Sequence, residues 1–252
     1  MFLIRMNKKI VLSVFFLLLS IFLYSQNKSN IKIMSYNMFI GKGMDDIISL
    51  ERVAEVINKV NPDFIGLQEV DSIAERSGWI DQAKELARLT GMFSVFAPAT
   101  ERSKGLYGIA SLSKKKPLSY LNIPLPGAEE PRTFLIVQYD DYILCNVHMS
   151  LDAESRKQSV KIINETVEKF DKPTIITGDF NMLPESEEFK LMTENWVLLS
   201  EASINTYPSD SPRQTLDYIF GYKNYNYKVT CKVVMYEPIV SDHLPIFIDI
   251  SL

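Results

Sequence analysis

An acid and an amide directly after an apolar run form the first stretch of the sequence that could do chemistry. Asp179 and Asn181 follow residues 174–177 and Gly178, in the order Thr-Ile-Ile-Thr-Gly-Asp-Phe-Asn. The β-branched run predicts a buried strand, and Gly178 predicts a sharp exit from it. Strand side chains at i and i+2 point the same way, so both oxygens could converge on a hard cation or a phosphoryl group. A loop-closing Asp/Asn turn is the alternative.

Other polar residues at the ends of apolar runs could complete such a site. Five follow strand-like runs and three precede them, and both histidines of the chain are included. Functional groups concentrate at strand ends and loops that a rigid scaffold positions. If neighbouring strands are antiparallel, starts and ends alternate along one edge, and all of these residues could face one cleft. They are Asn37, Glu69, His148, Asp179, Asn181, Asp217, Asp242 and His243.

The elements that must position these residues form a mixed α/β pattern. Apolar residues at helical spacing predict helices at 45–60, at 80–89 and around 160–170. Strands are expected at 31–36, 64–67, 93–97, 109–112, 134–139, 142–147, 174–177, 217–220, 228–235 and 247–252. Asp140 and Asp141 are expected to form a tight hairpin. No Gly/Ser-rich linker divides residues 28–252, which predicts one domain.

Six short segments, taken in order, resemble the signature of the endonuclease/exonuclease/phosphatase superfamily. Any one of them is common, whereas six in the right order are specific, and they span nearly the whole chain after its N-terminal segment. They are Ser35-Tyr36-Asn37, Leu67-Gln68-Glu69-Val70, Asn146-Val147-His148, Gly178-Asp179-Phe180-Asn181, Leu216-Asp217-Tyr218-Ile219 and Ser241-Asp242-His243-Leu244-Pro245. The superfamily includes deoxyribonucleases, abasic-site endonucleases, neutral sphingomyelinases, inositol-phosphate 5-phosphatases and deadenylases.

The resemblance implies a four-layered α/β/β/α sandwich of two packed mixed β-sheets flanked by helices. It also implies hydrolysis of phosphoester bonds with Mg²⁺ or, alternatively, Mn²⁺. By this resemblance Glu69 is the principal metal carboxylate, with Asn37 adjacent and Asp242 a further acidic ligand. Asp179 and Asn181 orient the nucleophilic water and the phosphate, or hold a second metal.

The resemblance also implies roles for the two histidines. Asp217 fixes the tautomer of His243, which acts as a base or as a phosphate ligand. His148 contacts the phosphate or protonates the leaving oxygen. Abasic endonucleases place a tyrosine at that position, so the chain resembles the deoxyribonuclease and lipase branches more. Ile109 replaces the amide of the family's Tyr-Gly-Asn-Ala segment, so one substrate-side hydrogen bond is not expected.

These roles agree with what phosphodiester hydrolysis requires. The reaction needs positive charge on the nonbridging oxygens, a positioned water and a stabilised leaving group. A cation on Glu69 would supply the positive charge, and His243 held by Asp217 would position the water. His148 or a metal-bound water would stabilise the leaving group. The alternative is that the acids are solvated strand ends and the amides are turn formers.

Three side chains outside this set leave two interpretations open. Trp79 and Tyr107 are expected to pack in the core, with contact to a base or an acyl chain as the alternative. Arg156 either lies on a solvated helix face or matches an arginine that family members carry near this position.

The first 25 residues predict export. Arg5, Lys8 and Lys9 precede an apolar stretch at residues 10–24, which is typical of a signal peptide and short for a membrane span. We expect cleavage near Ser25 or Gln26 and a periplasmic or secreted protein. An uncleaved segment that tethers the protein to the membrane is the alternative.

Composition limits the substrate classes. Residues 26–252 hold 24 basic and 31 acidic residues, a net charge of −7, which argues against tight nonspecific binding of nucleic acid. A lipid headgroup or another small phosphodiester is therefore favoured as the substrate over DNA or RNA. The sequence does not decide between a phosphodiester and a phosphomonoester. A noncatalytic envelope module that binds phosphorylated ligands is the rival from another class.

The sequence shows no obligatory protein partner, and we expect a monomer. Cys145 lies in an apolar run, where a buried free thiol is expected, although an exported chain also permits a bridge to Cys231.

Overall fold

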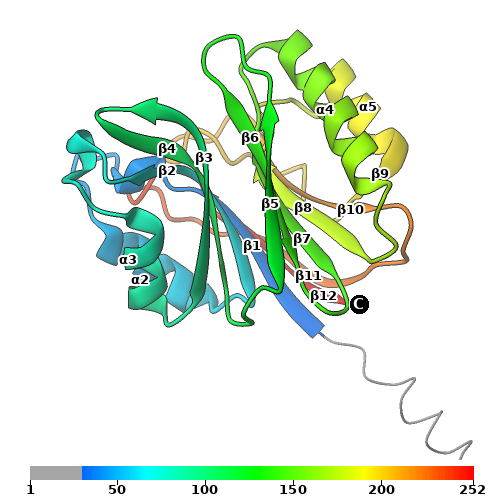
Figure 1. Cartoon of the computed structure of the whole chain (residues 1–252), viewed down its shortest axis with the longest axis horizontal. Helices are drawn as coiled ribbons and strands as arrows, with labels where there is room; N and C mark the ends of the chain where they lie inside the picture. The colour runs from blue at the N-terminus through cyan, green and yellow to red at the C-terminus, as the bar shows by residue number, and fades with distance from the viewer. Residues whose placement is uncertain (1–29) are drawn as a thin grey trace, which may run out of the picture.

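The computed structural model describes residues 30–252, and the predicted signal peptide lies outside them. Two six-stranded sheets pack face to face with helices on both outer faces (Figure 1). This confirms the predicted four-layered α/β/β/α sandwich. None of the helices in residues 30–252 combines the length and the apolar character needed to cross a bilayer.

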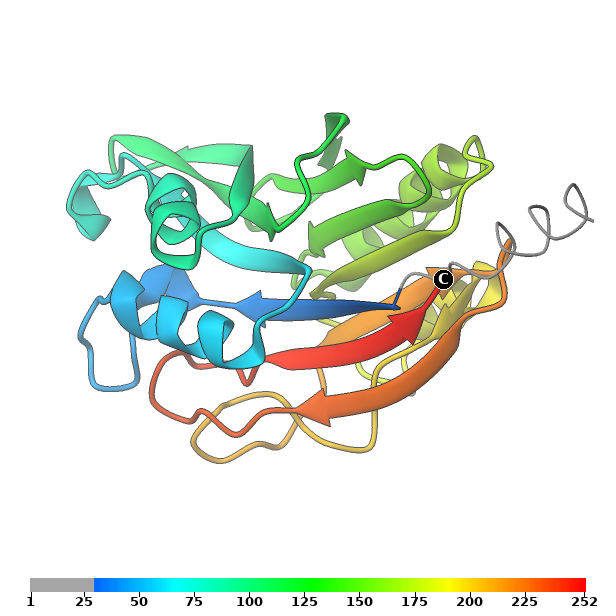
Figure 2. The ribbon, with the colours of Figure 1, turned by 90° about the horizontal axis from the view of Figure 1, so that it is seen from below.

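The first sheet has the strand order β11-β12-β1-β2-β4-β3. Its strands are β1 (Asn30–Asn37), β2 (Phe64–Ser72), β3 (Phe93–Arg102), β4 (Gly105–Ser113), β11 (Lys228–Val234) and β12 (Ile246–Ser251). Strands β1 and β2 are parallel, while β12 pairs antiparallel with β1. Figure 2 shows the C-terminal strands β12 and β11 (red and orange) beside β1 (blue). The last part of the chain is thereby brought next to the first.

The second sheet has the order β5-β6-β7-β8-β10-β9. Its strands are β5 (Ser119–Leu125), β6 (Arg132–Gln138), β7 (Ile143–His148), β8 (Thr174–Asp179), β9 (Trp196–Leu198) and β10 (Asp217–Tyr222). Strands β7 and β8 are parallel, and β10 pairs antiparallel with β8. The predicted hairpin at Asp140-Asp141 is confirmed, because the amide of Tyr139 donates to the carbonyl of Tyr142.

Alternation along the strands separates three apolar clusters, one for each interface between layers. Ile33 lies between the sheets, whereas its neighbour Met34 packs under the helices of the first sheet. Leu135 and Ile136 divide in the same way in the second sheet. Because strand side chains alternate between faces, each of these strands contributes to two clusters. Full burial of one such side chain stabilises the fold by about 1.5–3 kcal/mol.

Within residues 30–252, four α-helices cover the outer faces, two on each sheet. Helices α2 (Leu50–Val60) and α3 (Gln82–Thr90) lie on the first sheet, and α4 (Ala153–Val167) and α5 (Glu187–Asn195) lie on the second (Figure 1). The predicted helix at 45–60 begins five residues late. Ser49 caps it by accepting from the amide of Arg52, and Arg52 binds Asp45 in the preceding loop.

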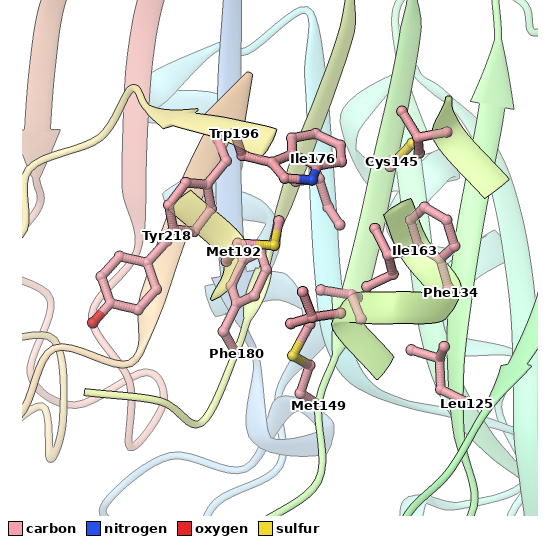
Figure 3. Close-up of a cluster of buried hydrophobic side chains, with 14 of the residues drawn as sticks. Leu125, Phe134, Cys145, Met149, Ile163, Ile176, Phe180, Met192, Trp196 and Tyr218 are labelled. Carbon is pink, nitrogen blue, oxygen red and sulfur yellow. The ribbon is translucent and has the colours of Figure 1, made fainter. Parts of the chain in front are cut away.

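The cluster beneath α4 and α5 fixes the strands that carry most of the site. Large side chains pack there against strands β7, β8 and β10, among them Trp196, Phe180, Tyr218 and Met192 (Figure 3). Cys145 belongs to the same cluster and is a buried free thiol, as expected, and Cys231 is also free. Burial of the aromatic rings makes these strand ends a rigid support for the side chains beyond them.

Candidate active site

Strand ends from both sheets place the predicted residues at one end of the sandwich. Asn37, His148 and Asp179 are the last residues of β1, β7 and β8. Asp217 is the first residue of β10 and pairs with Asp179 across the sheet, because β10 runs against β8. The ends of the parallel strands β7 and β8 therefore lie beside the start of β10. The predicted residues converge as expected, although only β8 and β10 of these three strands are antiparallel.

The carboxylate of Asp179 is the point on which the other groups converge. Its Oδ2 lies 3.1 Å from Asn37 Nδ2, 3.5 Å from His148 Nε2 and 3.6 Å from His243 Nε2. Asn37 Nδ2 also lies 3.1 Å from Glu69 Oε1 and so links two carboxylates. All of these residues except Glu69 are buried.

His243 is held from three sides. Its Nδ1 lies 2.9 Å from Asp217 Oδ2, and the Tyr207 ring packs against it at 4.8 Å between centroids. Its backbone amide donates to Ser241 Oγ, which in turn donates to the carbonyl of Asn37. The ring therefore has one free nitrogen, Nε2, which faces Asp179.

Glu69 reaches the site from inside a strand, not from its end as the sequence suggested. Strand β2 continues to Ser72, and its register with β4 shifts between Leu67 and Val70, which marks a β-bulge. Glu69 has φ 56°, a left-handed conformation that is uncommon for a residue with a side chain. The bulge turns this side chain out of the ladder and toward the cavity.

The expectation for Gly178 was wrong, and the geometry of Asn181 differs accordingly. Gly178 lies inside β8, where a Cβ atom would stand 2.3 Å from the carbonyl oxygen of Val147, so glycine permits the close approach of β7. The chain turns later, at Asn181, which has φ 49°. Asn181 donates from its amide to Asp179 Oδ1 and from Nδ2 to the carbonyl of Met149.

A cavity of about 450 Å³ opens above these residues. Six predicted residues line it: Glu69, His148, Asp179, Asn181, Asp242 and His243. Asn37 and Asp217 stand behind them and orient Asp179 and His243. The structure therefore brings together all eight predicted residues, six at the surface of the cavity and two in support.

The sequence interpretation missed a charged group on the rim of the cavity. The Arg132 guanidinium is buried between Glu129 Oε1 at 2.8 Å and Glu130 Oε1 at 3.3 Å. Its Nη1 lies 3.1 Å from His148 Nδ1. Arg132 precedes an apolar run, as Asp217 does, so the strand-end pattern contained the signal for it.

Tyr107 and Tyr207 also line the cavity. The guanidinium groups of Arg76 and Arg102 lie over the Tyr107 ring, 5.1 and 5.5 Å from its centroid. Tyr107 thus combines core packing with contact to the cavity.

The expectation that Trp79 packs in the core was wrong, and so was the solvated helix face for Arg156; its match to an arginine of the family stays a prediction. Trp79 was expected in the core but is half exposed. Arg156 is neither solvated nor in the site: it binds Glu188 on α5 and the carbonyls of Ser150 and Leu151.

Burial and charge shift the pKa values of the central groups in opposite directions. Burial raises the pKa of Glu69 and Asp242, and it raises that of Asp179 to about 7. Burial opposes a charge on His243, but the carboxylates of Asp217 and Asp179 outweigh it and raise the pKa to about 10. Burial, together with Arg132 and His243, holds the pKa of His148 well below its usual range.

The donor set fits a divalent cation. Glu69, Asp179 and Asp242 are oxygen donors at one cavity, and in residues 30–252 the basic side chains within 4 Å of them are only the two histidines at Asp179. Glu69 and Asp242, which have no basic side chain within this distance in the described part of the chain, suit a hard cation such as Mg²⁺. Ligand atoms of Asp179, Asp217 and His243 also lie within 4.8 Å of one another, and the hydrogen bond between Asp217 and His243 occupies one polar atom of each of these two side chains.

Two packed sheets with an acid-, amide- and histidine-lined cavity at their strand ends define a hydrolase of the α/β-sandwich class. The chain belongs to the endonuclease/exonuclease/phosphatase family, whose model matches residues 34–243. Members of this family depend on divalent metals and hydrolyse phosphoester bonds, and the chain is an enzyme of this kind. The exact bounds of the predicted domain, 28–252, stay a prediction.

Solved structures share the fold at low sequence identity. A family protein from Beutenbergia cavernae is 18% identical, with a TM-score of 0.75 over 88% of this chain and 72% of that one. A mannosyl-6-phosphatase of Bacteroides thetaiotaomicron is 16% identical, with a TM-score of 0.71 over 88% and 100%. The catalytic domain of human Nocturnin is 22% identical, with a TM-score of 0.67 over 88% and 94%.

Among curated proteins, an uncharacterized protein of Acanthamoeba polyphaga mimivirus is 22% identical over 237 residues. The match covers 78% of this chain and 88% of that protein.

Proposed function

We propose that the protein is an exported, Mg²⁺-dependent hydrolase that cleaves a phosphodiester in a lipid headgroup or another small molecule. The observation that carries the catalytic part is the convergence of Asn37, His148 and His243 on one oxygen of Asp179. Glu69 and Asp242, which line the cavity, would hold the metal, and Asn37 would orient Glu69 from behind it. Mn²⁺ is the alternative ion. When bound, the cation supplies positive charge to the phosphoryl oxygens and to the leaving oxygen.

The protein groups divide the remaining work according to their charges. With a pKa near 10, His243 is protonated at neutral pH and donates from Nε2 to a phosphoryl oxygen. Asp179, whose pKa lies near 7, accepts a proton from the attacking water as that water bonds to phosphorus and the ester oxygen departs. Asn181 positions the water. Of the two roles expected for His243, phosphate ligand is the one that its protonation favours.

The rim of the cavity supports a small substrate. Arg132 and Arg102 are its two arginines, and both bind the carboxylate of Glu130, so neither offers free charge to a polyanion. The net charge of −7 for residues 26–252 points the same way. Nucleic acid is the second candidate, because the family includes nucleases, and a small phosphomonoester stays within the same chemistry.

The test is hydrolysis of a bis-aryl phosphodiester by the purified protein with Mg²⁺ or Mn²⁺, with and without a chelator. We expect metal-dependent turnover that falls by about 100-fold or more in His243→Gln and Glu69→Gln. Lys161→Gln, on the exposed face of α4, serves as a matched control and should retain the rate. If wild type shows no metal-dependent turnover, a noncatalytic phosphate-binding module becomes the better interpretation.

Parallel assays on sphingomyelin, phosphoinositides, a sugar phosphate and plasmid DNA assign the substrate class. We expect a lipid or small-molecule phosphoester to be cleaved with a higher kcat/KM than DNA. A clear preference for plasmid DNA would overturn the substrate proposal while leaving the hydrolase proposal intact.

A further inference from the structure

Two histidines contact the same carboxylate oxygen through Nε2, but the Nδ1 atoms of their rings have different partners. One Nδ1 faces a carboxylate and the other faces a guanidinium group. His243 Nδ1 lies 2.9 Å from the carboxylate of Asp217, which can only accept a hydrogen bond while it is ionised. His148 Nδ1 lies 3.1 Å from Nη1 of Arg132, and a guanidinium can only donate. Nδ1 must therefore be a donor in His243 and an acceptor in His148.

We propose that Arg132 is a positioning residue that fixes His148 in the tautomer with its proton on Nε2, so that His148 offers a fixed hydrogen-bond donor to the cavity. Nδ1 of His148 accepts from Arg132, which leaves Nε2 to carry the proton, 3.5 Å from Asp179 Oδ2. A proton on Nδ1 would place two donors face to face. The catalytic consequence rests on the proposed function: His148 binds a phosphoryl or leaving oxygen through N–H and does not transfer its proton.

The surroundings of Arg132 are built to hold this geometry. Its Nε and Nη2 both donate to Glu129 Oε1, at 3.2 and 2.8 Å, while Nη1 lies 3.3 Å from Glu130 Oε1. Glu129 in turn accepts from the hydroxyl of Ser150 and the amide of Leu151, just beyond His148 in the chain. Only 6% of the Arg132 side chain is exposed, so both its plane and its Nη1 direction are set.

The same arrangement changes one expectation from the sequence. Family resemblance left two roles for His148, phosphate contact or protonation of the leaving oxygen. With an arginine at Nδ1, phosphate contact is the role that the structure supports. Thr133, which follows Arg132, pairs with His148 across β6 and β7, so the two strands fix the distance between the arginine and the histidine.

Nitrogen NMR of the protein labelled with ¹⁵N-histidine tests the tautomers directly, since the chain has two histidines. The purified protein is used without metal. The spectrum of His148→Gln shows which signals belong to which ring. We expect a pyrrole-like shift at Nε2 and a pyridine-like shift at Nδ1 of His148. A protonated Nδ1 of His148 in wild type would overturn the proposal. A wild-type spectrum in which neither ring has a pyridine-like Nδ1 would overturn it without an assignment from any variant.

Two variants then assign the effect to Arg132. In Arg132→Met, which keeps the length but loses the donors, the His148 signals should move toward the other tautomer. Arg102→Met removes the second cavity arginine, which contacts Glu130 and Tyr107, and should leave the His148 signals at their wild-type positions. Equal shifts in both variants would overturn the proposal, because general charge and not one hydrogen bond would be responsible.

Kinetics separate positioning from a direct role. Arg132→Met should lower kcat by about 10- to 100-fold, as loss of an outer partner of an active-site histidine does. If Arg132 acts through His148, Arg132→Met combined with His148→Gln should be no slower than His148→Gln alone. Additive losses would contradict this. Absence of turnover in wild type would contradict the proposed function, whereas the NMR result on the His148 tautomer would stay valid.

Discussion

Asp179 is buried, yet three nitrogen atoms and a backbone amide surround its two oxygens. Such a carboxylate is held in place by its neighbours, and burial raises its pKa by more than His243, Asn37 and the Asn181 amide lower it. Glu129 is the opposite case, because it lies at the rim and its oxygens are satisfied by Arg132, Ser150 and Leu151. These hydrogen bonds outweigh burial and lower its pKa to about 2.

The pKa of Glu129 predicts how its contribution to stability depends on pH. A carboxyl group with a folded pKa near 2 and an ordinary value of 4.5 stabilises the fold fully above about pH 4.5. This contribution is lost as the pH falls toward 2. The unfolding free energies of wild type and Glu129→Gln, measured by urea titration, should therefore differ most at pH 6 and converge near pH 2. A constant difference across this range would contradict the assignment.

At the scale of single residues the sequence predicted the site well, because polar residues at the ends of apolar runs are conspicuous. It did not predict Arg132, although this residue precedes an apolar run as Asp217 does. What the sequence could not predict is the pairing of Arg132 with Glu129, which lies in a loop without a pattern. It also missed Tyr207, which packs on His243 from a loop far from both strand ends. Side-chain pairing across loops is set by tertiary packing, which no local spacing encodes.

At the scale of elements, hydrogen bonds between buried polar groups link the two sheets. Gln68 Nε2 donates to Asn146 Oδ1 at 2.6 Å, and Asn146 Nδ2 donates to the carbonyls of Leu67 and Ala110. Gly66 permits this contact, because a Cβ there would lie 2.2 Å from Thr177 Oγ1. Buried polar side chains thus join the strand that carries Glu69 to the strand that carries His148, and Gly66 packs against Thr177 on the strand that carries Asp179.

Gly66→Ala should therefore disturb stability and activity together. Overpacking of this kind costs about 1–3 kcal/mol, and separation of the sheets would move Glu69 away from Asp179. The thermal unfolding temperature and kcat of Gly66→Ala should both be lower than those of wild type. Gly78→Ala, where no atom lies within 4 Å of an added Cβ, is the control: its φ of 76° predicts a modest loss of stability with an unchanged rate. Unchanged activity in Gly66→Ala would show that the contact does not position the site.

Most long, strongly patterned elements were predicted, whereas three weakly patterned ones were missed. Strand β5 is largely exposed at the sheet edge and contains Pro124, so it lacks an apolar run. Helix α5 buries only Glu188 and Met192, and its apolar face is too narrow to stand out. Strand β9 has three residues. Strand β2 was predicted too short, since Gln68 and Glu69 interrupt its apolar run although they lie within it.

At the scale of the whole molecule, export is a prediction that rests on the first 25 residues. A basic start followed by a short apolar stretch is typical of a cleaved signal peptide. N-terminal sequencing of the protein recovered from the periplasm or the medium should begin at Ser25, Gln26 or Asn27. Recovery of an intact Met1 in the membrane fraction would support the tethered alternative instead.

Strand β1 runs through the sandwich from Asn30 to Asn37, and its last residue binds Glu69 and Asp179. Eight strand residues span about 26 Å, so the point where the chain enters the fold lies a full sheet length behind the cavity. The protein could be attached at this point through a natural tether, an affinity tag or a sensor surface. The opening of the cavity would then face away from the attachment. If the segment before residue 30 stayed in a membrane, the enzyme would present its cavity away from that membrane and toward substrates delivered from the far side.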